Sequence, residues 1–318
     1  MLLSIIIPAY NAEKYLDECL ESCFRQDMPI GDYEVIIIND GSADKTLEVA
    51  ERWASEHSSI RIISQTNKGL SMARNAGIEN ARGRYLMFLD SDDRIAENRL
   101  GKIAQICSES APDMLRICAA NVIDGQAVRR FTYHHAGMMT GREALRYNFQ
   151  VCAPFAIYSR DFLKKNNLHF CPGIYHEDNL FTPIAYYLAE KMVTCNDVVY
   201  FVRQTPGSIT RTANLKRSKD LLTVAGLLDE FASAHVEKSY RKYFDKQIAD
   251  CLNVCLKNAG SLKDDQQSSI VREILGRREI FRHFLKSSAA THKIEGLLLT
   301  AFPKHMLGIY RMLDLIHR

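Results

Sequence analysis

Short apolar runs alternate with segments of helical spacing over the first hundred positions of the chain. The apolar runs have no internal alternation, which indicates strands that are buried on both faces. Helical segments between them indicate βαβ units and a mostly parallel sheet, hence an α/β fold. The predicted strands are Leu3–Ile7, Glu34–Ile38, Ile60–Ser64 and Tyr85–Leu89, with helices at Glu13–Arg25, after the capping residues Ser42 and Asp44, and at Leu70–Ala81.

The middle of the chain mixes both patterns. Two strand-like stretches flank Asp124-Gly125, a dipeptide typical of tight hairpins. Thr140 can cap a short helix that follows it. The predicted elements are strands at Asp113–Val122, Ala127–Tyr133, Phe155–Ser159 and Val198–Arg203, and helices at Arg142–Phe149 and Glu177–Ala189.

Strand signals stop after Thr212. Residues 218–257 and 266–286 have the spacing of amphipathic helices, and Ile294–Ile316 is apolar on one side with an interruption at Pro303. The pattern therefore predicts a catalytic α/β domain over residues 1–212 and a helical C-terminal subdomain over residues 213–318.

Composition narrows the class of protein. The chain has 318 residues, of which 47% are apolar and 25% charged, as expected for a folded globular protein. The net charge of +3 gives no argument for nucleic acid as a partner. No apolar stretch reaches the roughly 18 residues of a membrane-spanning helix, and MLLSIIIPAY lacks the basic start of a signal peptide. Nine scattered cysteines without metal-ligand spacing indicate reduced thiols, so we expect a cytoplasmic protein.

The charge is unevenly distributed. Residues 216–318 carry 18 Lys plus Arg and 12 Asp plus Glu, a net of +6, whereas residues 1–215 carry 23 basic and 26 acidic side chains, a net of −3. With the apolar side of Leu297–Ile316, this excess allows a peripheral contact with the inner face of a membrane. A helical subdomain packed on the catalytic domain, or a homodimer surface, is the alternative.

Each early strand ends in polar residues. The endings are Pro8-Ala9-Tyr10-Asn11, Asn39-Asp40-Gly41-Ser42 and Asp90-Ser91-Asp92-Asp93. In open α/β sheets ligands bind beyond the carboxyl ends of the strands, so these endings predict an acidic site. Carboxylates there favour a hard divalent cation, Mg²⁺ or Mn²⁺, that also binds phosphate oxygens. The glycine-rich dinucleotide motif and the P-loop are absent, which argues against NAD and P-loop chemistry.

Six segments occur in a recognisable order: PAYN, NDGSADKT, NKGLSMARNAG, YLMFLDSDD, HEDNLF and RQTPGSITR. Together they resemble glycosyltransferase family 2, whose members have the GT-A fold. The resemblance covers about residues 1–212. It implies an inverting enzyme that transfers a sugar from a nucleotide sugar, expected to be a UDP-sugar, to an acceptor hydroxyl.

The resemblance also implies roles for particular residues. Asp40 would hydrogen-bond the uracil edge, Asp90 would contact ribose or sugar hydroxyls, and Asp92 would bind the metal that bridges the diphosphate. Arg203 would approach the diphosphate as a fixed cation. The other residues implied for the nucleotide sugar are Pro8, Ala9, Tyr10, Asn11, Lys68, Gly69, Arg74, Asn75, Ser91 and Ser208.

Catalysis is implied for Glu177 and Asp178, which match the family's Glu-Asp pair. Asp178 would accept the proton of the acceptor hydroxyl as that oxygen attacks the anomeric carbon. One base and one metal imply direct displacement with inversion. The implied reaction is hexosyl or N-acetylhexosaminyl transfer to a saccharide or lipid-linked saccharide, in bacterial-type polysaccharide or glycolipid assembly of the cell envelope.

Several motif residues also have a purely structural interpretation. Asp40 could serve only as a turn and cap residue, and Asp90 and Asp93 could lie in a solvated turn. Arg74 could be a surface residue, and Glu177 could serve only to favour a helix start. His134, His135 and His176 lack metal-ligand spacing and are interpreted as ordinary histidines.

Two departures from the family pattern concern the site. Ala153-Pro154-Phe155 stands where many members have an aromatic residue, and Arg203-Gln204-Thr205-Pro206 lacks the histidine that serves some members as a metal ligand.

Other function classes are not excluded by spacing alone. A non-catalytic nucleotide-sugar-binding or scaffold protein would not need Asp92 and Asp178. A sugar nucleotidyltransferase would need a glycine-rich loop after the first strand, and PAYNAEKY has no glycine. A glycosidase would need two carboxyl groups flanking the scissile bond and no metal.

Overall fold

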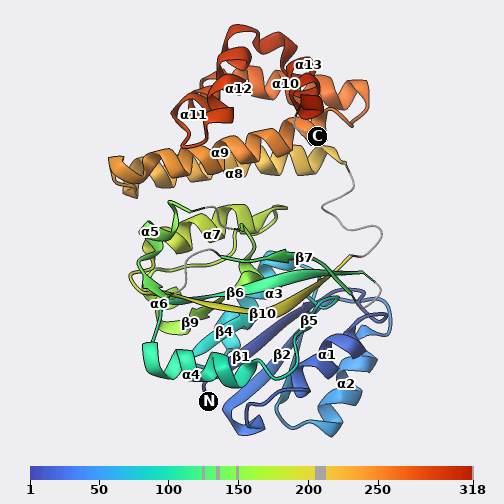
Figure 1. The fold of residues 1–318 in the computed structure, drawn as a ribbon. Helices are drawn as coiled ribbons and strands as arrows, with labels where there is room; N and C mark the ends of the chain where they lie inside the picture. The colour runs from blue at the N-terminus through green and yellow to red at the C-terminus, as the bar shows by residue number, and fades with distance from the viewer. Residues whose placement is uncertain (124–125, 134–136, 148–149, 205–212, 317–318) are drawn as a thin grey trace. The chain divides into compact units, whose positions relative to one another are not determined.

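The computed structural model describes residues 1–123, 126–133, 137–147, 150–204 and 213–316. The chain forms two compact units (Figure 1). The first unit comprises Met1–Gly173 and Leu188–Thr205, and the second comprises Ile174–Tyr187 and Pro206–Arg318.

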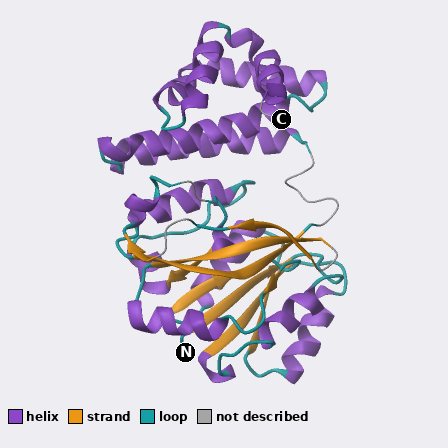
Figure 2. Ribbon diagram, in the orientation of Figure 1, coloured by secondary structure: helices purple, strands orange, loops and turns teal. Residues whose placement is uncertain are grey.

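One mixed sheet organises the first unit, with helices packed against it (Figure 2). Its strand order is β3-β2-β1-β4-β9-β6-β10-β5, while β7 pairs with β6 and β8 with β10. The first four strands of the order β3-β2-β1-β4 are parallel, and β6 with β10 is a second parallel pair. The other pairings are antiparallel. The strands are β1 Leu3–Ala9, β2 Tyr33–Asp40, β3 Ile60–Gln65, β4 Tyr85–Phe88, β5 Arg94–Ile95, β6 Met114–Ile123, β7 Gln126–Phe131, β8 Gly137–Met139, β9 Ala156–Ser159 and β10 Met192–Arg203.

Helices connect these strands and supply the other half of the core. The helices of the first unit are α1 Leu16–Phe24, α2 Thr46–Glu56, α3 Leu70–Asn80, α4 Leu100–Ser110, α5 Gly141–Ala144 and α6 Arg160–Lys165, with 3-10 turns at Ile30–Asp32 and Ala153–Phe155.

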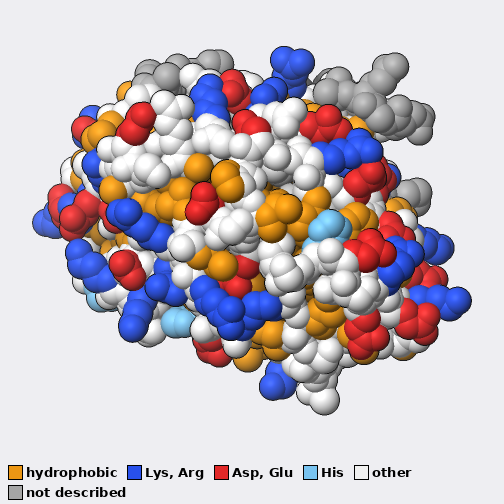
Figure 3. Space-filling view, turned by 90° about the horizontal axis from the view of Figure 1, so that it is seen from below, with side chains coloured by type: hydrophobic (Ala, Val, Ile, Leu, Met, Phe, Trp, Pro, Cys, Tyr) orange, Lys and Arg blue, Asp and Glu red, His pale blue; other side chains and the backbone are white. Residues whose placement is uncertain are grey.

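On the face drawn in Figure 3, Lys and Arg side chains lie among Asp and Glu side chains, with hydrophobic side chains between them.

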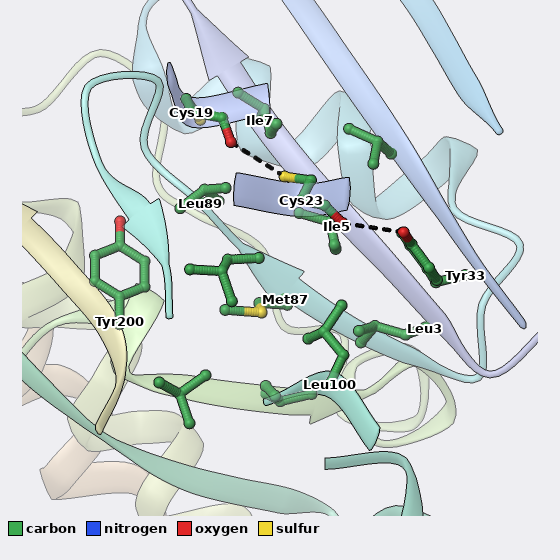
Figure 4. Packing of buried hydrophobic residues seen from close by; sticks show 14 of the residues in the cluster. Leu3, Ile5, Ile7, Cys19, Cys23, Tyr33, Met87, Leu89, Leu100 and Tyr200 are labelled. Atoms are coloured by element: carbon green, nitrogen blue, oxygen red, sulfur yellow. Dashed lines mark hydrogen bonds between the residues drawn. The ribbon is translucent and has the colours of Figure 1, made fainter. Parts of the chain in front are cut away.

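The core under the parallel strands is continuous and almost fully buried. Ile5 and Ile7 of β1 pack with Met87 of β4 and with Cys19 and Cys23 of α1 (Figure 4). β1 and β2 are buried at every position, which explains why they lack the alternation of a half-exposed strand. This packing fixes the carboxyl ends of the strands, where the polar residues lie.

The second unit is entirely helical in the residues that the structure describes. An aromatic cluster of Tyr187, Phe231 and Phe244 joins three of its helices, and the rings of Phe231 and Phe244 stack with centroids 5.8 Å apart. The helices are α7 Glu177–Leu188, α8 Leu215–His235, α9 Lys238–Ala259, α10 Asp264–Gly276, α11 Arg282–Lys286, α12 Ala290–Ala301 and α13 Met306–Ile316, with 3-10 turns at Arg278–Phe281 and Pro303–His305.

The predicted fold class is confirmed, with a sheet that is more mixed than the sequence pattern indicates. The predicted helix at residues 218–257 is two helices that meet at Val236–Glu237, a turn without glycine or proline. The hairpin between β6 and β7 forms, although its turn at Asp124-Gly125 lies outside the described residues. The domain boundary at residue 212 stays a prediction, and by its contacts Ile174–Tyr187 groups with the C-terminal helices.

None of the helices in the described part of the chain is both long and apolar enough to cross a bilayer.

Candidate active site

The loops that follow β1 and β2 are bound to each other. The Asn11 side chain accepts a hydrogen bond from the backbone N–H of Ala43 at 2.9 Å, and the Asn11 N–H donates to Ser42 Oγ at 3.1 Å. Thr46 Oγ1 accepts from the N–H of Ala12 at 2.7 Å. Asn11 has a positive φ of 50°, which asparagine tolerates better than most residues. The exposed ring of Tyr10 lies beside this braced loop.

Asp40 ends β2 and holds the segment that leads into α3. Its side chain is 3% exposed. Its carboxylate accepts hydrogen bonds from Gln65 Nε2 at 2.6 Å, from the Lys68 N–H at 2.9 Å and from the Gly69 N–H at 2.8 Å. Because a carboxylate has about four acceptor positions, one remains for a further donor. Asp40 is therefore more than a turn residue, since it fixes the loop before α3.

Gly69 is the N-cap residue of α3 and has a φ of 84°, in the region that glycine adopts without strain. Gly41 is a second such position, at φ 70°, and a Cβ there would lie 2.7 Å from the backbone nitrogen of Asn67. Gly41 thus allows the loops after β2 and β3 to approach each other closely, whereas Gly69 is required only by its backbone conformation.

Arg74 of α3 is buried and contacts the acidic loop after β4. Its guanidinium donates to Asp90 Oδ1 at 2.9 Å and lies 5.2 Å from the centre of the Phe170 ring. The neighbouring Asn75 exchanges two hydrogen bonds with the backbone of Phe170, at 2.8 and 2.9 Å. The alternative that Arg74 is a surface residue is wrong, because its side chain is 2% exposed.

Asp93 is the buried member of the acidic loop, so the solvated-turn interpretation is wrong for it. Its carboxylate accepts from the Tyr200 hydroxyl at 2.8 Å and from the Arg203 N–H at 2.8 Å. The Tyr200 oxygen in turn accepts from the Asp90 N–H at 3.1 Å. Burial and the nearby carboxylates of Asp90 and Asp92 raise the pKa of Asp93 well above its usual value. The end of β10 is thereby joined to the end of β4.

Arg203, the last residue of β10, also contacts the acidic loop Asp90–Asp93. Its Nε donates to the backbone oxygen of Asp92 at 3.0 Å, and its terminal nitrogen pairs with Glu18 of α1. Arg94 pairs with the other oxygen of Glu18 at 2.6 Å. The Arg203 guanidinium also lies 5.3 Å from the ring centre of Tyr15. Two cations thus share one carboxylate at the edge of the acidic loop.

The electrostatics of the loop favour a cation. Asp90, Asp92 and Asp93 lie within four positions. Burial, then the neighbouring Cys23, then the charges of these three residues raise the pKa of the Cys19 thiol behind the loop. The part of these pKa shifts that comes from neighbouring carboxylates reflects a negative potential at the loop, which a bound cation would lower. Within the residues that the structure describes, no group of three or more His, Cys, Asp and Glu side chains is arranged to hold a metal by itself.

Glu177 and Asp178 begin α7 in the second unit. Glu177 is 7% exposed, and Asp178 is partly buried. His176 precedes them with a positive φ of 62°, and its carbonyl accepts the Asn179 N–H at 3.0 Å. Burial and the charge of Arg217 lower the pKa of His176 to about 4, so this imidazole is neutral near pH 7.

The family is decided by a sequence comparison that agrees with this geometry. The family model "Glycosyl transferase family 2" matches residues 4–171, which span β1 through the acidic loop and on to Phe170. The chain belongs to glycosyltransferase family 2. The family resemblance of the motifs is confirmed.

Relatives of known name support this membership. The uncharacterized glycosyltransferase EpsJ of Bacillus subtilis is 32% identical, over 66% of this chain and 63% of its own length. The glycosyltransferase GlyG of Streptococcus pneumoniae is 29% identical, over 79% of this chain and 81% of its own. The poly(ribitol-phosphate) beta-N-acetylglucosaminyltransferase TarS of Staphylococcus aureus is 28% identical over 80% of this chain, which spans 44% of TarS.

A solved structure confirms the fold. Residues 1–349 of S. aureus TarS in complex with UDP-GlcNAc align with a TM-score of 0.75, covering 98% of this chain and 90% of that chain at 24% identity. The GT-A fold with a helical C-terminal region is therefore shared with TarS.

The structure places most of the predicted site residues at one edge of the sheet in the first unit. Asp40, Lys68 and Gly69 are linked by hydrogen bonds, as are Arg74 and Asp90. Glu177 and Asp178 belong to the other unit, and Ser208, His134 and His135 lie outside the described residues. The roles implied for all of these residues toward ligand stay predictions.

Three residues at this edge escaped the motif analysis: Glu18, Asp93 as a bracing group, and Tyr200. One signal was available for Tyr200, because a buried tyrosine needs a hydrogen-bond partner for its hydroxyl. Its partner, 107 positions earlier in the chain, is not visible from a single sequence.

Proposed function

We propose that the protein is an inverting, metal-dependent glycosyltransferase that uses a UDP-sugar. The observation that carries this proposal is the acidic loop Asp90–Asp93, held at the carboxyl end of β4 by Arg74, Tyr200 and Arg203. Next to the nucleotide-side loop that Asp40 holds, this arrangement suits a ligand with a base, a sugar and a charged diphosphate. Family membership supports the same reaction class.

The proposed metal is Mg²⁺ or Mn²⁺, held by Asp92 with Asp90 nearby. Carboxylate oxygens are the donors that these hard cations prefer, and few protein ligands are expected when phosphate oxygens and water complete the shell. When bound, the ion would stabilise the charge of the departing diphosphate. Arg203 is fixed at the same loop by its bond to the Asp92 carbonyl and would add a second positive charge.

We assign the general base to Asp178, with Glu177 beside it. Asp178 would accept the proton from the acceptor hydroxyl as its oxygen attacks the anomeric carbon, and the bond to the diphosphate oxygen breaks on the opposite face. Glu177 is buried at the first turn of α7, where the helix N-terminus favours a carboxylate. It would hold the start of the helix.

The donor and acceptor are proposed by chemical class. TarS is named as a poly(ribitol-phosphate) beta-N-acetylglucosaminyltransferase and has been solved with UDP-GlcNAc. By analogy we propose transfer of a hexosyl or N-acetylhexosaminyl group to a saccharide or lipid-linked saccharide in cell-envelope polymer assembly, at the cytoplasmic side. A lipid-linked acceptor would place the enzyme at a membrane surface.

The test is UDP release from a panel of UDP-sugars with Mn²⁺, combined with calorimetric UDP binding. We expect Asp92→Ala to abolish both transfer and metal-dependent UDP binding, and Asp178→Asn to keep binding but lose transfer. Asp197→Asn is a matched control, because Asp197 pairs with Lys102 on the surface. Normal turnover by Asp178→Asn would refute the base assignment, and UDP binding without any sugar transfer would favour a non-catalytic binding protein.

A further inference from the structure

α12 has a buried face and, on its opposite side, an exposed apolar face. One face carries His292, Gly296 and Leu299, which are buried, and a Cβ on Gly296 would lie 2.7 Å from Phe284 of α11. The other face carries Ile294 and Leu297, which are 60% and 64% exposed. Phe302, directly after the helix, is 57% exposed. We call Ile294, Leu297 and Phe302 the α12 strip.

The strip lies in a strongly basic part of the chain. Between residues 280 and 311 the Lys and Arg residues are Arg282, Lys286, Lys293, Lys304 and Arg311, and the only acidic residue is Glu295. Glu295 is 8% exposed and accepts a hydrogen bond from Asn253 at 2.9 Å. Lys286, Lys293 and Lys304 are exposed. Within this range the exposed charged side chains are therefore all basic, although Arg282 is paired with Asp229 and His292 of the buried face contacts Asp250.

We propose that the α12 strip docks on an anionic phospholipid surface. A bilayer interface takes up exposed Ile, Leu and Phe side chains in the plane of the headgroups, and anionic lipids attract nearby lysines. A soluble protein partner of the same shape would need acidic groups complementary to Lys293 and Lys304. A second copy of this strip would instead bring like charges together, which disfavours a symmetric dimer through it.

The test is flotation of the full chain with vesicles of phosphatidylcholine alone and of equimolar phosphatidylcholine and phosphatidylglycerol. We expect flotation only with the anionic vesicles. Replacing Ile294 and Leu297 by Ser should lower the partition coefficient by about tenfold or more. Lys293→Glu with Lys304→Glu should lower it by more than about fivefold and make it insensitive to salt. Ile30→Ser is the matched control, because Ile30 is 55% exposed in the other unit.

The outcomes separate the alternatives. Equal flotation of the wild type and the Ile294/Leu297 variant would overturn the proposal, as would absence of flotation with anionic vesicles. A concentration-dependent dimer that the same variant abolishes, without lipid binding, would assign the strip to self-association and also overturn it. UDP release by the variants in vesicle-free solution reports that they are folded.

A second, independent observation concerns the residues just before α7. The positive φ of His176 is uncommon for a residue other than glycine, and neighbours must offset its strain. Two residues of α8 do so. Arg217 Nε donates to His176 Nε2 at 2.9 Å, and Asp220 accepts the Tyr175 N–H at 2.8 Å.

Further contacts hold Asp220 and Arg217 in place. Asp220 also accepts from Lys216 at 2.5 Å, and Lys216 lies 4.6 Å from the centre of the Tyr175 ring. The first turn of α8 is capped by Asn214, which accepts the Arg217 N–H at 2.8 Å. The direction in which α7 begins is thus set by the start of α8.

We infer that Arg217 and Asp220 are positioning residues for Asp178, a role that rests on the proposed function. They would hold the turn that aims the first residues of α7 without contacting substrate. The inference assigns to α8 a role in orienting α7, which lies in the same unit apart from its last residue.

The experiment separates positioning from folding. Arg217→Ala should lower kcat by about tenfold to a hundredfold with little change in the donor KM, because a misplaced base slows the chemical step more than binding. Arg217→Lys should recover part of the loss. In a His176→Gly background, which accepts the positive φ, Arg217→Ala should add little. Arg241→Ala is the control, since Arg241 pairs with Asp229 elsewhere in the same unit.

An unchanged kcat in Arg217→Ala would overturn the inference, and so would a loss confined to the donor KM. Failure of the proposed function would be visible separately, because Asp178→Asn would then retain transfer irrespective of Arg217.

Discussion

Replacement of Asp40 by Ala separates a structural role for this residue from a role in reading uracil. The carboxylate is buried and accepts three hydrogen bonds from Gln65, Lys68 and Gly69. In Asp40→Ala the Gln65 amide can turn toward water, but the Lys68 and Gly69 N–H groups lose their acceptor. We therefore expect the folded state itself to lose stability, before any ligand is considered.

The magnitude follows from those two backbone donors. A buried group left without its partner costs about 1–3 kcal/mol. Two donors that become partly hydrated at the loop surface give an expected loss of about 3 kcal/mol in the free energy of unfolding. Trp53, the only tryptophan of the chain, lies in α2 of the same unit, so urea unfolding followed by its fluorescence reports the relevant transition.

Asp197→Ala is the control, because the Asp197 side chain is 37% exposed and pairs with a surface lysine, Lys102. An Asp40→Ala protein as stable as wild type, within about 0.5 kcal/mol, would refute the loop-holding role. If its UDP affinity nevertheless fell strongly, Asp40 would act on the ligand alone. We expect both quantities to fall, since the loop carries Lys68 and Gly69.

Three further changes test other parts of the structure. The pKa of His176 is about 4 in the folded protein, below its ordinary 6.5, so between these pH values only the unfolded chain gains a proton. The free energy of unfolding should therefore fall by up to about 3 kcal/mol as the pH drops from about 6.5 to about 4. His176→Gln should remove this contribution in circular-dichroism melts at stepped pH. Gly41→Ala should cost more than about 1 kcal/mol in Trp53-monitored unfolding, because its φ is 70° and a Cβ meets the Asn67 backbone; a neutral result would contradict the close approach. Phe244→Ala should cost about 3–5 kcal/mol in the helical unit, and a loss below about 1 kcal/mol would show that the aromatic cluster does not hold α8 and α9 together.

The sequence predicts the parallel half of the fold well, because those strands are buried on both faces and bounded by polar loops. Leu3–Ile7 and Glu34–Ile38 fall inside β1 and β2. The antiparallel half is less visible. β5 has two residues and β8 has three, so neither offers a pattern long enough to detect. The turn between α8 and α9 is missed because Val236–Glu237 contains no helix-breaking residue.

The residues of the candidate site could likewise be predicted from the sequence only in part. Strand endings predict which residues gather at the sheet edge, since parallel strands present their carboxyl ends together. What those residues bond to is set by pairs far apart in the chain, such as Asp93 with Tyr200 and Glu18 with Arg203. A single sequence shows each partner as an isolated polar residue. The burial of Asp93, on which its raised pKa depends, follows only from the assembled sheet.

The Glu177-Asp178 pair shows why a motif and its structural unit need not coincide. By sequence the pair lies before the last strand and therefore inside the predicted 1–212 domain. In the structure its helix packs through Tyr187 on Phe231 and Phe244, and the turn before it is bonded to α8. A change in the helical region can therefore act on the proposed base while the loops around Asp40 and Asp92 stay intact. Loss of transfer with unchanged UDP binding, on substitution of a residue in α8, is the signature that this arrangement predicts.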